Sequence, residues 1–537
     1  MNDATVNRLT LFNFWVAFGA FGLACFFGMY QVLERSGLFT FLQSPAAYFA
    51  SVSTHGVLMA FVLTTFFIMG FGYHTAARSL RRPLWNPPLA WAGYGVCVVG
   101  VALAAIPLLL GKASVLYTFY PPIQANVFFY LGATLLVVGS WFWCVIMLVM
   151  FAQWKRDRPG ETVPLPMFAT AANALLWLWT SAGVALESVF QLLPWALGLT
   201  DTIDVGLART LFAWTLHPIV YFWLIPAYIA LYCYVPQAAG GKLFSDLLAR
   251  TAFVLILVLG LPIGFHHLYM DPEQGAGWKF LHMVGTFAVA IPTLLTGFTV
   301  IASLEMAGRK RGGAGLFGWI GALPWKNPMV LAAILSLLML VLGGFGGIVN
   351  ASYAMNAMVH NTAWVPGHFH LIFAGTVITM YLAVAYKLWP ELCGRRLYSV
   401  DLALVQLWGW FIGMVIMTTP WHILGLLGQP RRISAVQYNS VLTLSWEPYE
   451  LAMIAGGSIL LASACLFVYL LYKTQTAGEK VDAREDAAAD SNHGAPAWLN
   501  GFALWNRLIL VLMVLSYGYP ILQFFLLKTH SPTAWGY

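Results

Sequence analysis

The stretch Val365-Pro366-Gly367-His368-Phe369-His370 lies inside a long apolar run, and the interpretation of the chain depends on it. Two histidines two residues apart on a helix point about 200° apart, because each residue turns the helix by about 100°. Such a pair suits two metal-containing cofactors, one on each side of the helix, better than a single metal ion. Metal-binding side chains inside a membrane are costly and commonly mark function. The stretch therefore predicts a functional helix between two cofactors.

The composition around this stretch is that of a membrane protein. Of the 537 residues, 60% are hydrophobic and 9% are charged, whereas soluble proteins carry about 25% charged residues. We predict an all-α fold of about thirteen transmembrane helices in one polytopic domain, residues 1–537, because thirteen apolar segments approach the ~20 residues that cross a bilayer. The predicted spans are 10–33, 48–73, 88–110, 125–152, 168–194, 207–235, 250–269, 279–304, 328–350, 363–389, 402–427, 450–472 and 504–527.

The basic residues predict the orientation of these spans. With the N-terminus inside, 20 of the 27 lysines and arginines fall on the inner side and seven on the outer side. This asymmetry favours an inside N-terminus and an outside C-terminus in a bacterial or archaeal cytoplasmic membrane. The basic residues sit in short loops, so the net charge of +7 does not indicate nucleic-acid binding.

The polar segment 474–500 is predicted to be a flexible inner loop before the last helix. The six cysteines are scattered, and no disulfide framework is expected.

Six histidines are predicted to lie at one depth of the membrane, toward its outer side. A single histidine in a span is more often a hydrogen-bonded core residue than a ligand. Six at one level, spread over four helices, favour a layer of metal or haem ligands. These residues are His55, His217, His266, His267, His368 and His370.

The segment His217-Pro218-Ile219-Val220-Tyr221 adds a tyrosine to this layer. Residues at positions i and i+4 share a helix face, so we expect Tyr221 to lie next to His217. The pair His266-His267 at a helix end supplies two further imidazoles. Three imidazoles without a thiolate suit copper, although zinc or iron could also bind them.

The segments Trp214–Trp223, Gly264–His267, Ala363–His370 and Glu305–Trp325 together resemble the catalytic subunit of haem-copper oxygen reductases. The resemblance is to the B-type, cytochrome-ba class of cytochrome c oxidase, and it covers nearly the whole chain. It implies a terminal respiratory oxidase that reduces O2 to water and couples this reaction to proton translocation. The implied cofactors are a low-spin haem b, a high-spin haem of the a-type and one copper ion, CuB.

The resemblance also implies roles for individual residues. His55 and His370 are the implied axial ligands of the low-spin haem, and His368 is that of the high-spin haem. The implied copper ligands are His217, His266 and His267, with Tyr221 joined covalently to His217 and acting as a catalytic donor of an electron and a proton. Arg431 and Arg432, on an outer loop, are expected to pair with haem propionates through forked hydrogen bonds.

Protons need a route from the inner face to this layer. A-type relatives place a glutamate where this chain has Ile219, so their glutamate-ended channel is expected to be absent. Tyrosines of one helix, threonines of the next and a serine near the inner entrance resemble the K-type pathway of B-type enzymes, although such residues also simply pack and hydrogen-bond in helices. The predicted route contains Tyr228, Tyr232, Ser245, Thr293, Thr296 and Thr299.

One departure from the B-type pattern concerns the outer loop. Relatives carry an aspartate four residues before the histidine that is here His360, whereas this chain has Asn356. Both residues are expected near a haem propionate, with a structural hydrogen bond as the alternative for His360. His282 and His422 are interpreted as structural or propionate-shell residues. Glu187, an acid within a span, is either a structural group or part of a water path.

Three alternatives to a cytochrome c-fed oxidase remain open from the sequence. A quinol-fed oxidase and a nitric oxide reductase would use the same scaffold, and Tyr221 argues against the reductase. A proton-coupled transporter would not predict six histidines at one depth. The chain lacks the paired cysteines of a CuA centre, so electrons are expected through a partner, subunit II, which carries CuA and is fed by cytochrome c.

Overall fold

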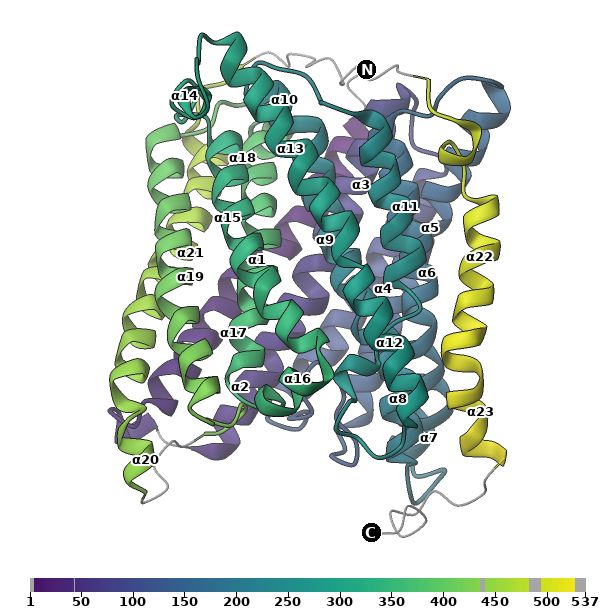
Figure 1. Ribbon diagram of the computed structural model, residues 1–537, viewed down its shortest axis with the longest axis vertical. Helices are drawn as coiled ribbons and strands as arrows, with labels where there is room; N and C mark the ends of the chain where they lie inside the picture. Colours follow the sequence, from purple (N-terminus) through teal and green to yellow (C-terminus); the bar gives the residue numbers. More distant parts are fainter. Residues whose placement is uncertain (1–3, 43, 435–439, 482–493, 527–537) are drawn as a thin grey trace.

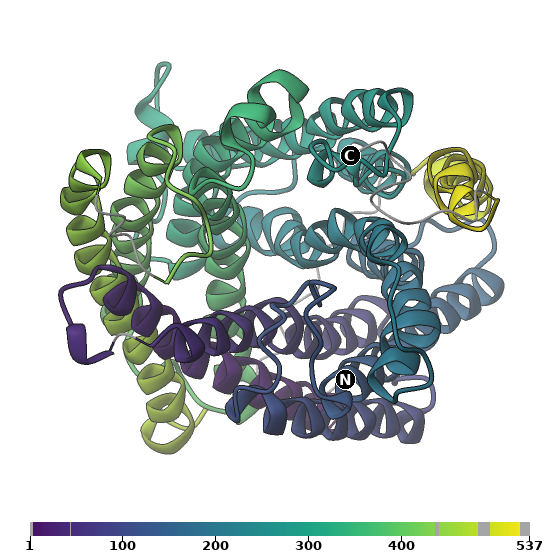
Figure 2. The same cartoon turned by 90° about the horizontal axis from the view of Figure 1, so that it is seen from below.

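The computed structural model describes residues 4–42, 44–434, 440–481 and 494–526. Within these ranges the regular elements are helices, and the strand-like contacts are two isolated bridges. The long helices run beside one another along the long axis of the molecule (Figure 1). Seen from one end, they form a bundle with the C-terminal helices at its edge (Figure 2). The predicted all-α membrane fold is confirmed.

The longer helices account for most of the described chain. They are α1 (Ala4–Arg35), α2 (Pro45–Val57), α3 (Thr64–Leu80), α4 (Pro87–Leu109), α5 (Val127–Asp157), α6 (Leu165–Glu187), α8 (Val205–Leu216), α9 (Pro218–Ile229), α11 (Asp246–Gly260), α12 (Ala276–Ala288), α13 (Ala290–Lys310), α15 (Pro328–Ala351), α18 (Thr379–Cys393), α19 (Val400–Leu426), α21 (Glu447–Ala477) and α22 (Ala503–Met513).

Shorter helices and wide or tight turns complete the spans. The short α-helices are α7 (Leu193–Ala196), α10 (Val235–Ala238), α14 (Gly318–Gly321), α16 (Tyr353–Val359), α17 (Trp364–His370), α20 (Val441–Leu444) and α23 (Tyr519–Leu526). The π-helical segments are Leu58–Leu63, Ser188–Leu192, Ala230–Tyr234, Leu371–Ile378 and Val514–Gly518. The 3-10 segments are Thr40–Leu42, Phe265–His267 and Ala497–Leu499.

Twelve helical segments of the described chain are long and apolar enough to cross a membrane, and they coincide with twelve of the predicted spans. The remaining predicted span, 250–269, contains α11, which has 15 residues and ends at Gly260. The helix stops there because Pro262 lacks a backbone N–H and disfavours helical geometry in the residue before it. His266 and His267 therefore lie in a separate 3-10 turn, and the expectation that they end the helix itself was wrong.

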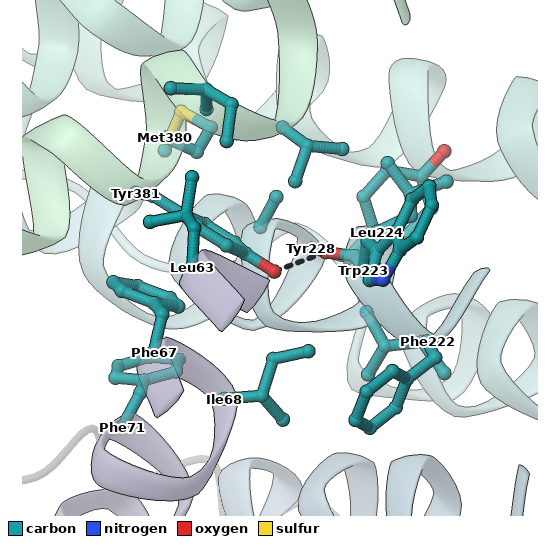
Figure 3. Close-up of a cluster of buried hydrophobic side chains, with 14 of the residues drawn as sticks. Leu63, Phe67, Ile68, Phe71, Phe222, Trp223, Leu224, Tyr228, Met380 and Tyr381 are labelled. Carbon is teal, nitrogen blue, oxygen red and sulfur yellow. Dashed lines mark hydrogen bonds between the residues drawn. The ribbon is translucent and has the colours of Figure 1, made fainter. Parts of the chain in front are cut away.

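A cluster of buried side chains joins α3, α9 and α18 in the middle of the bundle (Figure 3). The rings of Phe67 and Tyr381 stack with their centroids 3.6 Å apart. The hydroxyl of Tyr381 donates a hydrogen bond to the backbone carbonyl of Trp223 at 2.7 Å. This contact fixes α9 against the span that continues from α17, so the two helices richest in candidate functional residues have a defined separation.

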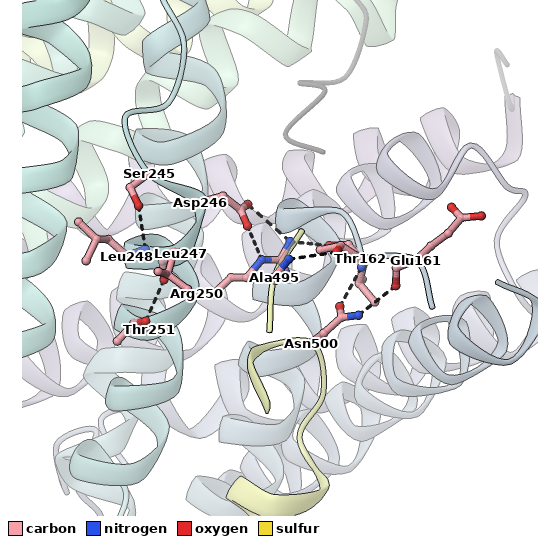
Figure 4. A network of polar contacts seen from close by, with 11 residues as sticks. Glu161, Thr162, Ser245, Asp246, Leu247, Leu248, Arg250, Thr251, Ala495 and Asn500 are labelled. Carbon is pink, nitrogen blue, oxygen red and sulfur yellow. Dashed lines mark hydrogen bonds and ion pairs between the residues drawn. The ribbon is translucent and has the colours of Figure 1, made fainter. Parts of the chain in front are cut away.

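A polar network stabilises one end of the bundle (Figure 4). Arg250 and Asp246 form an ion pair at 2.6 Å with side chains 0% and 3% exposed. Arg250 also donates to the carbonyl of Val163 at 2.6 Å. Asn500 accepts from the backbone N–H of Val163 at 2.9 Å and donates to the carbonyl of Glu161. The network thus ties α11 and the segment before α22 to the α5–α6 loop.

The segment 474–500 has defined contacts at both of its ends. Residues up to Ala477 belong to α21, and the carbonyl of Glu479 accepts from the backbone N–H of Arg396 at 2.8 Å. Ala497–Leu499 form a 3-10 turn. Residues 482–493 lie outside the described residues, so the flexible loop stays a prediction for the part between these ends.

Candidate metal centre

Three histidine side chains converge where α8, α9 and the turn after α11 meet. The potential ligand atoms of His217, His266 and His267 all lie within 4.8 Å of one another. The ring centroids of His217 and His266 are 4.5 Å apart, and those of His266 and His267 are 4.2 Å apart. The buried Nε2 atom of His217 has no hydrogen-bond partner among the described residues. A set of three imidazoles with a free nitrogen fits a copper ion.

Tyr221 lies beside this cluster. Its ring centroid is 4.9 Å from that of His217. The helix is interrupted between α8 and α9 at His217, because Pro218 has no N–H to continue the backbone bonding. His217 nevertheless keeps a right-handed helical conformation, so the expected neighbourhood of positions i and i+4 is retained. A side chain at Gly260 would meet the Tyr221 ring at 3.0 Å, which shows how closely α11 packs on the tyrosine.

His55 and His370 face each other as a parallel pair. Their rings are tilted by only 13°, and their centroids are 6.3 Å apart. One metal ion with a nitrogen ligand about 2.0–2.1 Å away on each side takes up about 4 Å of such a separation. The two imidazoles would therefore suit the binding of one haem iron between them, and a haem held by both residues would serve electron transfer.

Backbone carbonyls fix the orientation of all three candidate haem ligands. The Nδ1–H of His55 donates to the carbonyl of Ala24 at 2.8 Å, and that of His370 donates to Pro366 at 2.7 Å. The Nδ1–H of His368 donates to the carbonyl of Gly343 at 2.8 Å. A hydrogen bond at Nδ1 leaves Nε2 as the unprotonated nitrogen, which is the one that binds a metal.

His368 and His370 point to different neighbours, as the spacing in α17 predicts. His368 lies against α15, where a side chain at Gly347 would meet its ring at 3.1 Å. His370 lies against α19, with its ring centroid 4.7 Å from that of Trp421. The helix therefore separates two environments: one contains His55, and the other lies near the three-histidine cluster.

Arg431 and Arg432 lie in the loop after α19 and face no carboxylate of the described residues. Arg431 donates two hydrogen bonds to the side-chain oxygen of Asn361, at 3.1 and 2.7 Å. Arg432 lies 5.2 Å from the ring centre of Tyr120. Burial and the neighbouring Arg432 lower the pKa of Arg431 to about 9, and burial also lowers the pKa of Arg432. Two half-buried guanidinium groups without an acid partner fit anionic propionates.

Asn356 and His360 lie between this loop and the three-histidine cluster. The side-chain amide of Asn356 donates to the carbonyl of Asn350 at 2.8 Å and to that of His266 at 3.5 Å. Burial, followed by the charges of Arg431 and Arg209, lowers the pKa of His360 to about 4. His360 is therefore neutral at pH 7 unless a negative group binds beside it.

The predicted tyrosines and threonines are hydrogen-bonded across α9 and α13. The Tyr228 hydroxyl is 3.3 Å from Thr293 Oγ1, and the Tyr232 hydroxyl donates to Thr296 Oγ1 at 2.7 Å. Thr299 Oγ1 is buried without a hydrogen-bond partner among the described residues. Ser245 instead caps α11, because its Oγ accepts from the backbone N–H of Leu248 at 3.2 Å.

Three further polar residues lie near these sites: His282, for which the sequence left two roles open, and Thr286 and Ser303, which it did not indicate. His282 Nδ1 accepts from the N–H of Gly264 at 3.0 Å, and its ring stacks on Phe265, which holds the turn bearing His266 and His267. Thr286 Oγ1 is 3.1 Å from His266 Nδ1. Ser303 extends the threonine face of α13, and its Oγ accepts from the N–H of Phe244 at 2.9 Å. Continuing the spacing from Thr299 by one helical turn would have identified Ser303.

Comparison with known proteins gives consistent matches. The family model described as "Cytochrome C and Quinol oxidase polypeptide I" matches residues 8–459. Cytochrome c oxidase subunit 1 of Thermus thermophilus is 41% identical, with 97% of this chain and 95% of the relative covered. The corresponding subunit of Thermostichus vulcanus is 27% identical, with 82% and 79% covered. A solved heme-copper terminal oxidase dimer superimposes with a TM-score of 0.92 at 36% identity, covering 97% of this chain and 93% of the other.

Proposed function

This chain belongs to the cytochrome c and quinol oxidase polypeptide I family and is the catalytic subunit of a haem-copper oxidase, and from that premise we propose how its residues divide the work. His217, His266 and His267 bind CuB, and His368 binds the haem that receives O2. His55 and His370 bind a low-spin haem b. The observation that carries the proposal is the three-histidine cluster with Tyr221 at its side.

The bound haems and copper supply electron transfer and the reduction of O2. Tyr221 donates a proton and an electron at this site, and its closeness to His217 suits the covalent bond found in the resembling family. The Nδ1–H bonds of His55, His368 and His370 keep each imidazole in the metal-binding tautomer. Arg431 and Arg432 hold the propionates, with Asn356 and His360 beside them.

Protons reach Tyr221 through the hydroxyl groups between α9 and α13. The hydroxyl groups of Tyr228 and Tyr232 carry protons along α9. Their contacts with Thr293 and Thr296 support a hydrogen-bonded chain. Thr299, which has a free hydroxyl, and Ser303 extend the route toward the end of α13. Ser245 lies at the entrance, where its hydroxyl also caps α11.

The chain works with other subunits in a bacterial or archaeal cytoplasmic membrane. Membership of the family makes cytochrome c and O2 the expected partners, and electrons enter through a subunit II that carries CuA. The N-terminus is inside and the C-terminus is outside. The high-spin haem is of the a-type. A proton-coupled transporter, which remained open from the sequence, is excluded by the family.

Metal and carbon monoxide binding of the purified complex test these assignments. The wild type should contain two haems, of which one binds carbon monoxide, and copper in this subunit. His266→Asn should lose that copper and keep the low-spin haem spectrum. Retention of the copper in His266→Asn, or a wild-type complex in which both haems bind carbon monoxide, would contradict the ligand assignment.

A further inference from the structure

One acid of the membrane-spanning part has no role in the functions described so far. Glu187, the last residue of α6, is 0% exposed. Neither of its carboxyl oxygens has a hydrogen-bond partner among the described residues, and it forms no ion pair there. A buried carboxylate without a partner is very costly, so Glu187 is held in its neutral, protonated form. The neutral side chain of Glu187 therefore carries a proton inside the bundle.

Polar side chains near Glu187 also lack hydrogen-bond partners among the described residues. Gln191 lies four residues later, and both polar atoms of its side chain are buried and unbonded among the described residues. The hydroxyl of Thr180, seven residues before Glu187 and on the same helix face, is also unbonded. Tyr130 on α5 is a titratable group close enough to interact electrostatically with Glu187. Several unbonded polar atoms on one face provide partners for water molecules.

The backbone also changes at this position. α6 passes directly into the π-helical segment Ser188–Leu192 after Glu187. Such wide turns leave backbone groups without their regular helical bonds and are frequent at functional sites. The wide turn therefore adds to the polar groups along this face of α6.

Contacts with α8 place Glu187 relative to the candidate metal centre. Thr215 Oγ1 donates to the carbonyl of Thr180 at 2.8 Å and accepts from the N–H of Val184 at 2.9 Å. Thr215 precedes His217 by two residues, so Thr180 lies at the level of the metal ligands. Glu187 lies about 10 Å further along α6, at about 1.5 Å for each residue. It thus lies outward of the metal layer, near the level of Arg209 on α8, which pairs with Asp271 at 2.7 Å.

We propose that Glu187 is a redox-linked proton-binding site between the metal layer and the outer face, a proposal that rests on the function assigned above. Reduction adds negative charge at the metal layer and favours the protonated form of Glu187. Oxidation removes that charge and favours release of the proton. On release the carboxyl O–H bond breaks, a water molecule accepts the proton and passes it outward, and the carboxylate that remains is hydrogen-bonded by water held at the unbonded polar atoms of Gln191 and Thr180. On the next reduction a proton from the inner side restores the acid. No electron passes through Glu187.

Infrared difference spectroscopy of the complete complex tests this proposal. Reduction of the wild type should produce a change in the carbonyl stretch of a protonated carboxylic acid, with the small shift in deuterium oxide that such a group shows. Glu187→Gln should lose this signal. Glu161→Gln should keep it, because Glu161 is an exposed acid paired with Arg158 on the inner side and controls for the mere loss of a carboxyl group.

The outcomes separate this proposal from the function on which it rests. An absent wild-type signal, or one that survives in Glu187→Gln, would overturn the role of Glu187. If Glu187→Gln does not assemble, Glu187→Asp should move the frequency of the signal, and an unmoved frequency would overturn the role as well. Oxygen uptake by the same samples tests the oxidase function, because the haems can be reduced electrochemically whether or not O2 is the substrate.

Discussion

The substitution Tyr232→Phe tests whether protons pass between α9 and α13. Tyr232 is 1% exposed and donates to Thr296 Oγ1 at 2.7 Å. Tyr381 offers a matched control, because it is 0% exposed and also donates one hydrogen bond at 2.7 Å, to the carbonyl of Trp223 (Figure 3). Only Tyr232 belongs to the proposed proton route. The two Tyr→Phe variants should therefore lower the free energy of unfolding by similar amounts, whereas only Tyr232→Phe should impair proton transfer.

The cost to stability follows from the lost hydrogen bond. Each substitution removes one buried hydroxyl and keeps the ring, so the free energy of unfolding should fall by about 1 kcal/mol in both variants. Thr296 is not left unbonded in Tyr232→Phe, because its own hydroxyl still donates to the carbonyl of Pro292 at 2.8 Å. The cofactor content of both variants should therefore equal that of the wild type.

The effect on turnover should separate them. Loss of a positioned proton-transfer group commonly slows a reaction by about 10²–10⁴-fold. We expect Tyr232→Phe to slow steady-state oxygen uptake by at least about tenfold, which corresponds to about 1.4 kcal/mol in the barrier. Tyr381→Phe should stay near the wild-type rate. Equal rates for both variants, at equal haem and copper content, would refute the assignment of Tyr232 to the proton route.

Three further predictions concern Tyr221, the Arg250–Asp246 ion pair and the outer loop. Tyr221→Phe should keep both haems and the copper yet abolish turnover, as measured by optical spectra, metal analysis and oxygen uptake; normal oxygen reduction would remove the tyrosine from the mechanism. Arg250→Met should lower the free energy of unfolding by about 3–5 kcal/mol, because it leaves Asp246 buried without its partner, and adding Asp246→Asn should restore most of that loss in thermal unfolding. In the chain without bound haem, burial lowers the pKa of His360 from its ordinary value of 6.5 to about 4, so the unfolded state binds the extra proton between these values and the folded state is destabilised as the pH falls from 6.5 to about 4. The unfolding temperature of haem-free His360→Gln should therefore rise relative to that of the haem-free wild type over this pH range, and a constant difference would contradict the lowered pKa.

The sequence predicts the spans well because a membrane imposes a simple length and hydropathy requirement on each helix. Twelve of the predicted spans are present as long apolar helices. The exception is informative. The segment 250–269 is apolar throughout, but Pro262 and Gly264 end the helix early and leave His266 and His267 in a turn. Hydropathy alone does not distinguish a helix from an apolar turn that is buried inside the bundle.

The candidate ligands could also be identified from the sequence, because histidines are rare in apolar spans. Local spacing predicted that His368 and His370 face different neighbours and that Tyr221 lies near His217, and the structure shows both relationships. The approach of three histidines from distant segments to within 4.8 Å could only be inferred from their common depth.

Contacts between distant segments account for what the sequence could not predict. His282 supports a turn 18 residues away, and Ser303 bonds to Phe244 across 59 residues. Neither pairing leaves a periodic signal, since it depends on which helices become neighbours. For the same reason the lack of hydrogen-bond partners for Glu187 among the described residues depends on neighbours that the sequence does not specify.

Oxygen uptake by the purified complex, with reduced cytochrome c as the sole donor and cyanide as the control, tests the central claim most directly. The arrangement of His217, His266, His267 and Tyr221 predicts rapid, cyanide-sensitive uptake. A complex that contains both haems and the copper but consumes no oxygen under these conditions would contradict the assignment of this chain to a cytochrome c-fed oxidase.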